Sequence, residues 1–217
     1  MALKKREIND MTIKELHDKL YDEKTPRNPK LFIDNYEANL DLITNVDLTN
    51  LHDYDYAMRL TCDYAILLED SGYLKKGILY LDKAIDLMGN FPDYQKDKLF
   101  DIRYYELIVF HKARALYNLK KYSDSLPIFE RLDKAFPNNE KYLSWIYGLK
   151  RKKYEFYTWI GFGMIMTDLI LRTFLKGKNS LFDKVSFWFL LFALIFSVSS
   201  EILKRIQLNK QKKINAT

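Results

Sequence analysis

The side chains that could perform chemistry in this chain are few and widely spaced. Its three histidines, His17, His52 and His111, lie far apart and lack the short spacing of zinc ligands. Arg103 and His111 stand eight residues apart on one predicted helix, wider than helical ribonuclease motifs. No Gly-rich phosphate loop and no strand followed by GxGxxG occurs. We therefore expect no enzyme, no metal site and no cofactor.

Two further groups of polar residues could bind a ligand or act as a nucleophile. Asp53, Asp55, Asp63 and Asp70 lack the ligand spacing and the turn glycine of a calcium loop, so a solvent-exposed charged face is expected. The single cysteine, Cys62, cannot form an internal disulfide and lies in a helical pattern, where a small apolar side chain fits better than a reactive thiol.

One pair of opposite charges lies inside an apolar segment. Asp168 and Arg172 stand four residues apart, so they can pair on one face of a helix. Charges within a membrane span are costly and often functional. Two interpretations stay open. The pair is neutralised and faces a second span or another protomer, or it forms a polar seam in an oligomer, a small pore or a proton path.

The segments that would hold this pair are long enough to cross a bilayer. Residues 154–175 and 185–203 are mostly apolar, and each is close to the ~20 residues that span the hydrocarbon core. A pair of buried core helices would be the alternative, but residues 188–192 are apolar on every side and would need a large further partner. The sequence therefore predicts a transmembrane hairpin.

The charge is divided unevenly along the chain. Residues 1–149 carry 22 Lys and Arg against 25 Asp and Glu, whereas residues 150–217 carry 13 against 4. The first part offers no basic surface for nucleic acid, and the second favours anionic lipid headgroups. More basic residues lie before the first span and after the second than in the loop between the spans. This difference predicts cytosolic N- and C-termini, in a bacterial inner membrane or a eukaryotic organelle membrane. The basic side chains that flank the spans are Lys150, Arg151, Lys152, Lys153, Lys204 and Arg205.

Before the hairpin, apolar residues recur at helical spacing between turn signals. The first helix can be capped by Asp10 or Thr12, with Glu15 completing a capping box. Gly89 is expected in a left-handed cap at a helix end. The predicted helices cover residues 10–24, 30–45, 53–70, 74–88, 93–119 and 123–135.

Two antiparallel helix pairs resemble the tetratricopeptide repeat, a helix–turn–helix unit of 34 residues. The residues that carry the resemblance in 106–139 are Ala113, Tyr122, Ser125, Phe129, Leu132 and Pro137. Those in 58–89 are Ala65, Gly72, Gly77 and Ala84. The resemblance implies a stack of helix pairs whose concave face binds a peptide or a partner helix.

The resemblance also implies which residues line that groove. Arg59 and Arg114 would hold a carboxylate, while Phe110 and Tyr117 would supply apolar anchors. The full predicted groove consists of Arg59, Cys62, Ile66, Glu69, Leu107, Phe110, Arg114 and Tyr117.

The sequence thus predicts an all-α chain in three parts: an N-terminal helix and linker over 1–28, a tetratricopeptide-like cytosolic domain over 29–150, and a transmembrane hairpin with a basic tail over 151–217. The expected function is a membrane-anchored scaffold or adaptor that binds a cytosolic protein or peptide and contacts membrane lipids. The alternative is a membrane effector whose hairpin oligomerises and permeabilises the bilayer in response to a signal. Homo-oligomerisation through the spans stays open.

Overall fold

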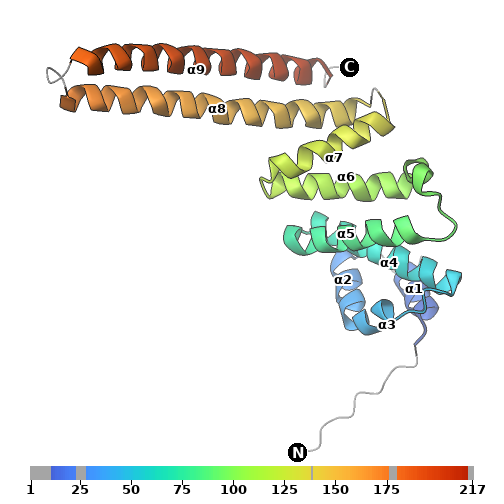
Figure 1. Ribbon diagram of the computed structural model, residues 1–217. Helices are drawn as coiled ribbons and strands as arrows, with labels where there is room; N and C mark the ends of the chain where they lie inside the picture. Colours follow the sequence, from blue (N-terminus) through green and yellow to red (C-terminus); the bar gives the residue numbers. More distant parts are fainter. Residues whose placement is uncertain (1–10, 23–27, 138, 176–179, 215–217) are drawn as a thin grey trace, which may run out of the picture. The chain divides into compact units, whose positions relative to one another are not determined.

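The computed structural model consists of α-helices and one short 3-10 helix (Figure 1). It describes residues 11–22, 28–137, 139–175 and 180–214, without the side chains of 172, 174–175, 180–185, 211–212 and 214. No strand occurs in these ranges, which confirms the all-α prediction for the described part of the chain. The chain divides into two compact units, residues 1–121 and 122–217, and each is described by itself.

The first unit begins with α1 and ends with α6. Its elements are α1 (Ile13–Tyr21), α2 (Pro29–Ala38), α3 (Leu40–Thr44), α4 (Leu51–Asp70), α5 (Leu74–Asn90), η1 (Lys96–Asp101) and α6 (Arg103–Asn118). The second unit contains α7 (Tyr122–Ala135), α8 (Glu140–Leu175) and α9 (Ser180–Ile214).

Side-chain caps fix where several helices of the first unit begin. The backbone N–H of Glu15 donates to Thr12 Oγ1 at 3.2 Å, and the N–H of Thr12 donates to Glu15 Oε2 at 2.8 Å. This is the predicted capping box, with Thr12 as the cap, and it satisfies two backbone donors at the start of α1. Asn28 and Asn50 cap α2 and α4 in the same way, through their side-chain oxygens.

The core of the first unit is built around α4, which contacts α1, α2, α5 and α6. Tyr36 of α2 stacks on Tyr64 of α4 with ring centroids 3.8 Å apart, and its hydroxyl lies 3.0 Å from Thr61 Oγ1. Gly77 of α5 faces the backbone of Glu69, where a β-carbon would meet the amide nitrogen at 3.3 Å. The absence of a side chain at Gly77 therefore lets α4 and α5 approach closely.

Two predicted helices are interrupted. The helix predicted over 30–45 breaks at Asn39, which ends α2 and begins α3. The prediction of one helix over 93–119 is wrong, because Ile102 is extended (φ −89°, ψ 106°) and separates η1 from α6. The extended residue allows Leu99 before it and Tyr105 after it to be buried together. No proline or glycine marks this break, so periodicity alone could not locate it.

The residues with a left-handed backbone conformation also differ from the prediction. Gly89 remains inside α5, which runs to Asn90, so the predicted glycine cap is wrong there. The positive φ angles in the described chain belong to Gly72 (83°), after α4, and to Lys120 (62°), after α6. At Gly72 the missing side chain removes the strain of this conformation, and the adjacent Tyr73 N–H donates to Leu68 O at 2.8 Å.

In the second unit, α8 and α9 lie side by side and antiparallel along most of their length (Figure 1). Phe129 of α7 stacks on Trp145 of α8, with ring centroids 5.2 Å apart and planes 5° from parallel. Farther along the hairpin, a β-carbon on Gly161 would lie 3.0 Å from Ser197 Cβ and 3.2 Å from Ser197 Cα. Of the two glycines Gly161 and Gly163, Gly161 is thus the one at which α8 and α9 approach each other closely.

One stretch of the described chain is long and apolar enough to cross a membrane. It covers Ser186–Lys210 of α9, and only 17% of its most apolar window is buried. The first predicted span, 154–175, is not confirmed, because α9 is the helix that meets this requirement among the described residues. The tetratricopeptide arrangement is not confirmed either, since the first compact unit ends at Lys121, inside the predicted repeat 106–139.

The close approach at Gly161 leads to a paired prediction. We expect Gly161→Ala to destabilise the α8–α9 packing by about 1–2 kcal/mol, because the new methyl group must displace the Ser197 backbone. Gly163 has nothing within 4 Å of its β-carbon position, so Gly163→Ala should instead stabilise the helix by roughly 0.5 kcal/mol. Denaturant titration of both full-length variants in detergent micelles measures the difference, and equal stabilities would contradict the packing.

Candidate functional site

The most densely bonded polar cluster of the first unit joins α4 to α6. The Glu69 side chain is only 1% exposed, and Arg114 Nε lies 2.9 Å from its Oε1 and 3.0 Å from its Oε2. The Nη2 group of Arg114 donates to Glu69 and also to Asp70. His111 Nδ1 lies 3.0 Å from Glu69 Oε2. A buried carboxylate is thus held by an arginine from a helix more than 40 residues away in sequence.

Two opposing effects determine the protonation of Glu69. Burial alone would raise its pKa, because the charged form loses water. The hydrogen bonds from His111 and Arg114, together with the charge of Arg114, outweigh burial and hold the pKa of Glu69 below its usual value of 4.5. Glu69 is therefore ionised near neutral pH and forms a buried ion pair with Arg114.

The same cluster contains three residues whose side chains are of types that can bind a metal ion. Ligand atoms of Glu69, Asp70 and His111 lie within 4.8 Å of one another. However, the guanidinium of Arg114 donates to both carboxylates and supplies the positive charge that a metal ion would bring. The arrangement therefore fits a structural ion pair that ties α4 to α6, and we assign no metal to it.

The residues of the predicted groove lie in different environments. Arg59 pairs with Asp55 at 2.8 Å on the surface of α4. Glu69, Phe110 and Cys62 are buried, and Tyr117 is half-buried. The guanidinium groups of Arg59 and Arg114 are thus engaged by acids of the same chain. Ile66 and Leu107 are the two predicted groove residues that lie together at a pocket.

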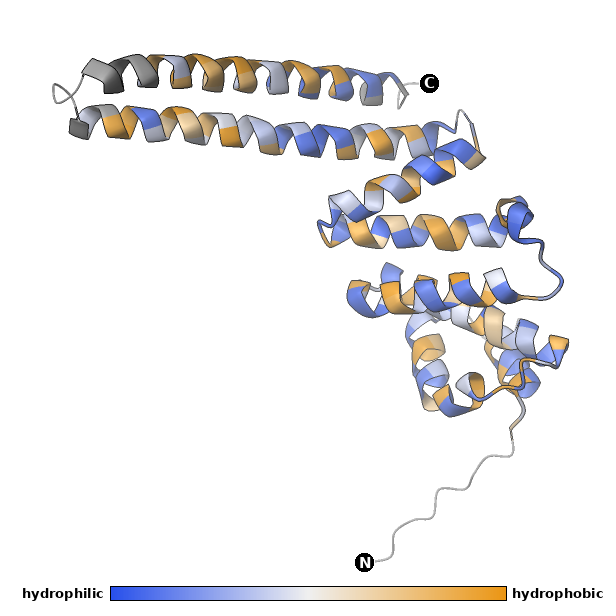
Figure 2. Cartoon of the chain, in the orientation of Figure 1, coloured by the Kyte–Doolittle hydropathy of each residue, from blue (hydrophilic) through white to orange (hydrophobic). Residues whose placement is uncertain are grey.

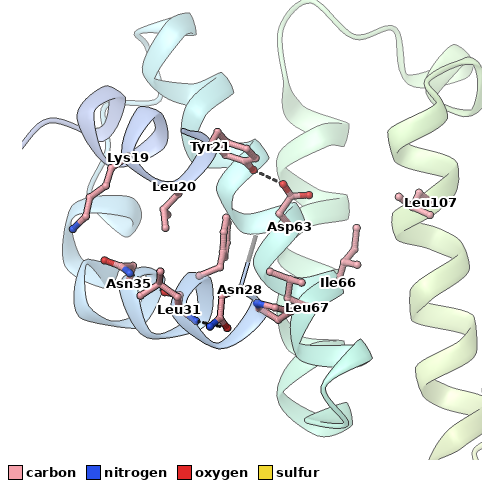
Figure 3. Close-up of a pocket in the computed structure, with 12 residues that line it drawn as sticks. Lys19, Leu20, Tyr21, Asn28, Leu31, Asn35, Asp63, Ile66, Leu67 and Leu107 are labelled. Atoms are coloured by element: carbon pink, nitrogen blue, oxygen red, sulfur yellow. Dashed lines mark hydrogen bonds between the residues drawn. The ribbon is translucent and has the colours of Figure 1, made fainter. Parts of the chain in front are cut away.

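This pocket, which we call the apolar pocket, has a volume of about 470 Å³, and Figure 3 shows the side chains that line it. Leu31 and Leu107 line it and are 46% and 37% exposed, so they present apolar surface at the pocket. The side chains that line it come from α1, α2, α4 and α6, and from the residue that caps α2. They are Lys19, Leu20, Tyr21, Asn28, Pro29, Leu31, Phe32, Asn35, Asp63, Ile66, Leu67 and Leu107.

A second pocket of about 580 Å³ shares two of these residues, Tyr21 and Asp63. We call it the tyrosine pocket, because aromatic side chains make up much of its wall. It is lined by His17, Tyr21, Met58, Arg59, Asp63, Tyr94 and Tyr104. Asp63 therefore lies where the two pockets meet.

Asp63 is held by two phenols. The hydroxyl of Tyr21 donates to one of its oxygens and the hydroxyl of Tyr104 donates to the other. Burial and the nearby Asp63 charge raise the pKa of Tyr104 well above its usual value, so this hydroxyl stays protonated and donates. Asp63 was expected on a charged solvent face, but it is half-buried, and its position follows from contacts with distant residues that spacing alone does not reveal.

In the second unit, Asp168 is 3% exposed and accepts a hydrogen bond from the Ser186 hydroxyl of α9. The side chain of Arg172, its predicted partner, lies outside the described residues. From Gly161 onward, the other described buried residues of α8 and α9 are small or polar, namely Gly161, Ala193 and Ser200. These small and polar residues of the hairpin thus face inward.

The large apolar side chains of the hairpin face outward. Trp159 and Trp188 are each 68% exposed, and Phe156, Phe192 and Ile195 are more than half exposed. Figure 2 shows hydrophobic residues recurring along α9 and along the C-terminal half of α8. This distribution is the reverse of that in a helix pair dissolved in water.

The basic residues beside the hairpin are partly neutralised by neighbouring acids. Lys150 pairs with Glu130 at 3.2 Å, and Lys152 pairs with Glu155 at 3.0 Å. On α9, Lys204 and Arg205 both pair with Glu201, at 2.8 and 3.3 Å.

Tyrosine rings lie beside two other lysines of the hairpin. Lys153 lies 5.9 Å from the Tyr157 ring, and Lys210 lies 5.6 Å from the Tyr147 ring of α8. Because Tyr147 of α8 faces Lys210 of α9, the basic segments of the two helices lie at the same end of the hairpin.

No protein-family model, curated protein or solved structure matches this chain.

Proposed function

We propose that this chain is a membrane-anchored adaptor, in which a hairpin of α8 and α9 holds the chain in a bilayer and the first helical unit binds a cytosolic protein. The apolar pocket carries this proposal. Its volume of about 470 Å³ lies within the range of ligand sites, and exposed leucines form part of its wall. Such a surface on a helical unit suits the apolar side chains of a peptide or partner helix.

The outward apolar surface supports the two-span anchor. Both α8 and α9 expose tryptophan and phenylalanine, while Asp168 and Ser186 bond to each other between the helices. In lipid, the exposed apolar side chains need no protein partner, and the inward hydrogen bond shields the carboxylate from hydrocarbon. The proposal therefore includes α8 as the first span, although α9 is the helix whose described residues qualify by length and composition.

The basic residues support an orientation. Lys150, Arg151, Lys152 and Lys153 on α8 lie at the same end of the hairpin as Lys204 and Arg205 on α9, because Tyr147 and Lys210 are in contact. Basic residues at one end favour the cytosolic side, where anionic headgroups add further attraction. Both ends of the hairpin would then be cytosolic, in the compartment of the proposed partner.

A crosslinking experiment tests the adaptor. A photoreactive phenylalanine analogue at Leu107, in the full-length chain expressed in its membrane, should give a discrete adduct with a cytosolic protein. The same analogue at Leu79 should not, because Leu79 is 69% exposed on α5 but lines neither pocket. Adducts of equal yield at both positions, or none at Leu107 in a folded protein, would count against the proposal.

A membrane effector is the second candidate, on the observation that a carboxylate, Asp168, lies buried within the hairpin. Intramembrane carboxylates often serve ion or proton paths. The hydrogen bond from Ser186 favours a structural role, because it occupies Asp168 inside one hairpin. Membrane depolarisation on expression of the full chain would favour the effector over the adaptor.

A further inference from the structure

Three of the five acidic residues of α4 form ion pairs, whereas Asp53 and Asp63 form none with the described residues. Asp55 pairs with Arg59, and Glu69 and Asp70 both pair with Arg114. Asp63 lies between these pairs in the sequence and accepts two tyrosine hydroxyls. Among the residues that the structure describes, no lysine, arginine or histidine forms an ion pair with Asp63. Its charge is thus balanced by neutral donors alone.

Asp63 retains the capacity to accept another donor. An ionised carboxylate has about four lone-pair positions, and each oxygen of Asp63 uses one for a phenol. Asp63 lines both the apolar pocket and the tyrosine pocket. The rings of Tyr21, Tyr94 and Tyr104 line the second pocket, and the faces of such rings attract cations.

We propose that the partner of the adaptor places a lysine or arginine side chain at Asp63 while an adjacent apolar side chain fills the apolar pocket. This inference rests on the proposed function and names the chemistry of its partner: a basic residue close to a large apolar one. Arg59, which also lines the tyrosine pocket, pairs with Asp55 through its Nε at 2.8 Å, and within the described residues it forms no ion pair with Asp63.

The layout of the pockets restricts the arrangement of the partner's side chains. Tyr21 and Asp63 belong to both pockets, so an apolar side chain between Ile66 and Phe32 lies next to the carboxylate. Lys19 lies at the far rim from Asp63 (Figure 3), so a basic residue is favoured at one end of the apolar pocket and disfavoured at the other. On a helical partner, residues three or four apart would supply the two side chains.

Selection from a random peptide library tests the inference. The full-length chain in lipid nanodiscs is the target, and a phage-displayed library of random peptides is the probe. We expect the enriched peptides to share a lysine or arginine within about four residues of a large apolar residue. For the best peptide, changing the basic residue to uncharged norleucine should weaken binding about tenfold, since it removes a charge-assisted hydrogen bond.

Variants of the protein complete the test. Asp63→Asn should weaken the basic peptide about tenfold and leave the norleucine peptide unchanged. Asp86→Asn, which removes an exposed carboxylate of α5 that lines neither pocket, should change neither affinity. The peptide substitution needs no change in the protein, so the test holds even if Asp63→Asn folds poorly.

The outcomes separate the two proposals. Peptides that bind at the apolar pocket, compete with each other and show no preference for a basic residue would overturn this inference and leave the adaptor standing. The same holds if Asp63→Asn binds the basic peptide as tightly as the unsubstituted chain. Failure to enrich any peptide whose binding depends on Leu107 would overturn both this inference and the adaptor proposal.

Discussion

Replacing Arg114 with methionine should destabilise the first helical unit by about 3 kcal/mol, because it leaves the buried Glu69 carboxylate without its charged partner. For a unit of this size the melting temperature would fall by roughly 10 °C. Hydrogen–deuterium exchange of α4 and α6 in the full-length chain should report the loss as faster exchange. Methionine preserves most of the aliphatic volume of arginine, so the effect isolates the ion pair.

Arg59→Met is the matched control for this substitution. Arg59 also pairs with an acid of α4, but its side chain is 56% exposed, so its loss should cost less than about 0.5 kcal/mol. Similar losses for the two variants would contradict a buried, energetically important pair at Glu69.

Acidification should reduce the difference between the unsubstituted chain and Arg114→Met. The pKa of Glu69 is below 4.5 in the folded chain, so its ion pair stabilises the fold above that pH and is lost as the pH falls through the folded value. Protonated Glu69 no longer needs a cation. The two melting temperatures should therefore converge at low pH, and a constant gap would contradict the assignment.

Replacing Ile195 with arginine should have the largest effect on membrane attachment. Ile195 lies in the middle of the apolar part of α9 and is 56% exposed. An arginine there would cost roughly 2.5–3.5 kcal/mol on insertion scales. We expect the fraction of full-length chain that resists extraction by alkaline carbonate to fall sharply.

Ile206→Arg provides the control for membrane attachment. Ile206 is 42% exposed and follows Lys204 and Arg205, so a new arginine there can reach the headgroup region. The carbonate-resistant fraction should then stay close to that of the unsubstituted chain. Equal loss from both positions would indicate that α9 is solvated by protein and not by lipid.

Much of the fold could be predicted from local patterns. Helices α4 and α5 were expected over 53–70 and 74–88, because their apolar periodicity is strong and Gly72 separates them. The Thr12 cap followed from the spacing of Thr12 and Glu15. The break at Ile102 could not be predicted, since the residue has no special backbone preference and no proline or glycine lies next to it.

The candidate site was harder to predict because its residues meet only in the folded unit. Glu69 and Arg114 were both expected to line a groove, as repeat positions imply, and their bond to each other depends on the packing of α4 with α6. Asp63 resembled Asp53, Asp55 and Asp70 of α4 in sequence, and its bonds to Tyr21 and Tyr104 distinguish it. Ile66 and Leu107 were predicted groove residues that do line one pocket, since both are apolar and lie on facing helices.

The order of the elements along the chain also has a consequence for biosynthesis. Both partners of the Glu69–Arg114 pair are translated before α8 begins at Glu140. Domains of a nascent chain generally fold in the order in which they leave the ribosome. The first unit can therefore close its buried ion pair while α8 and α9 are still being synthesised.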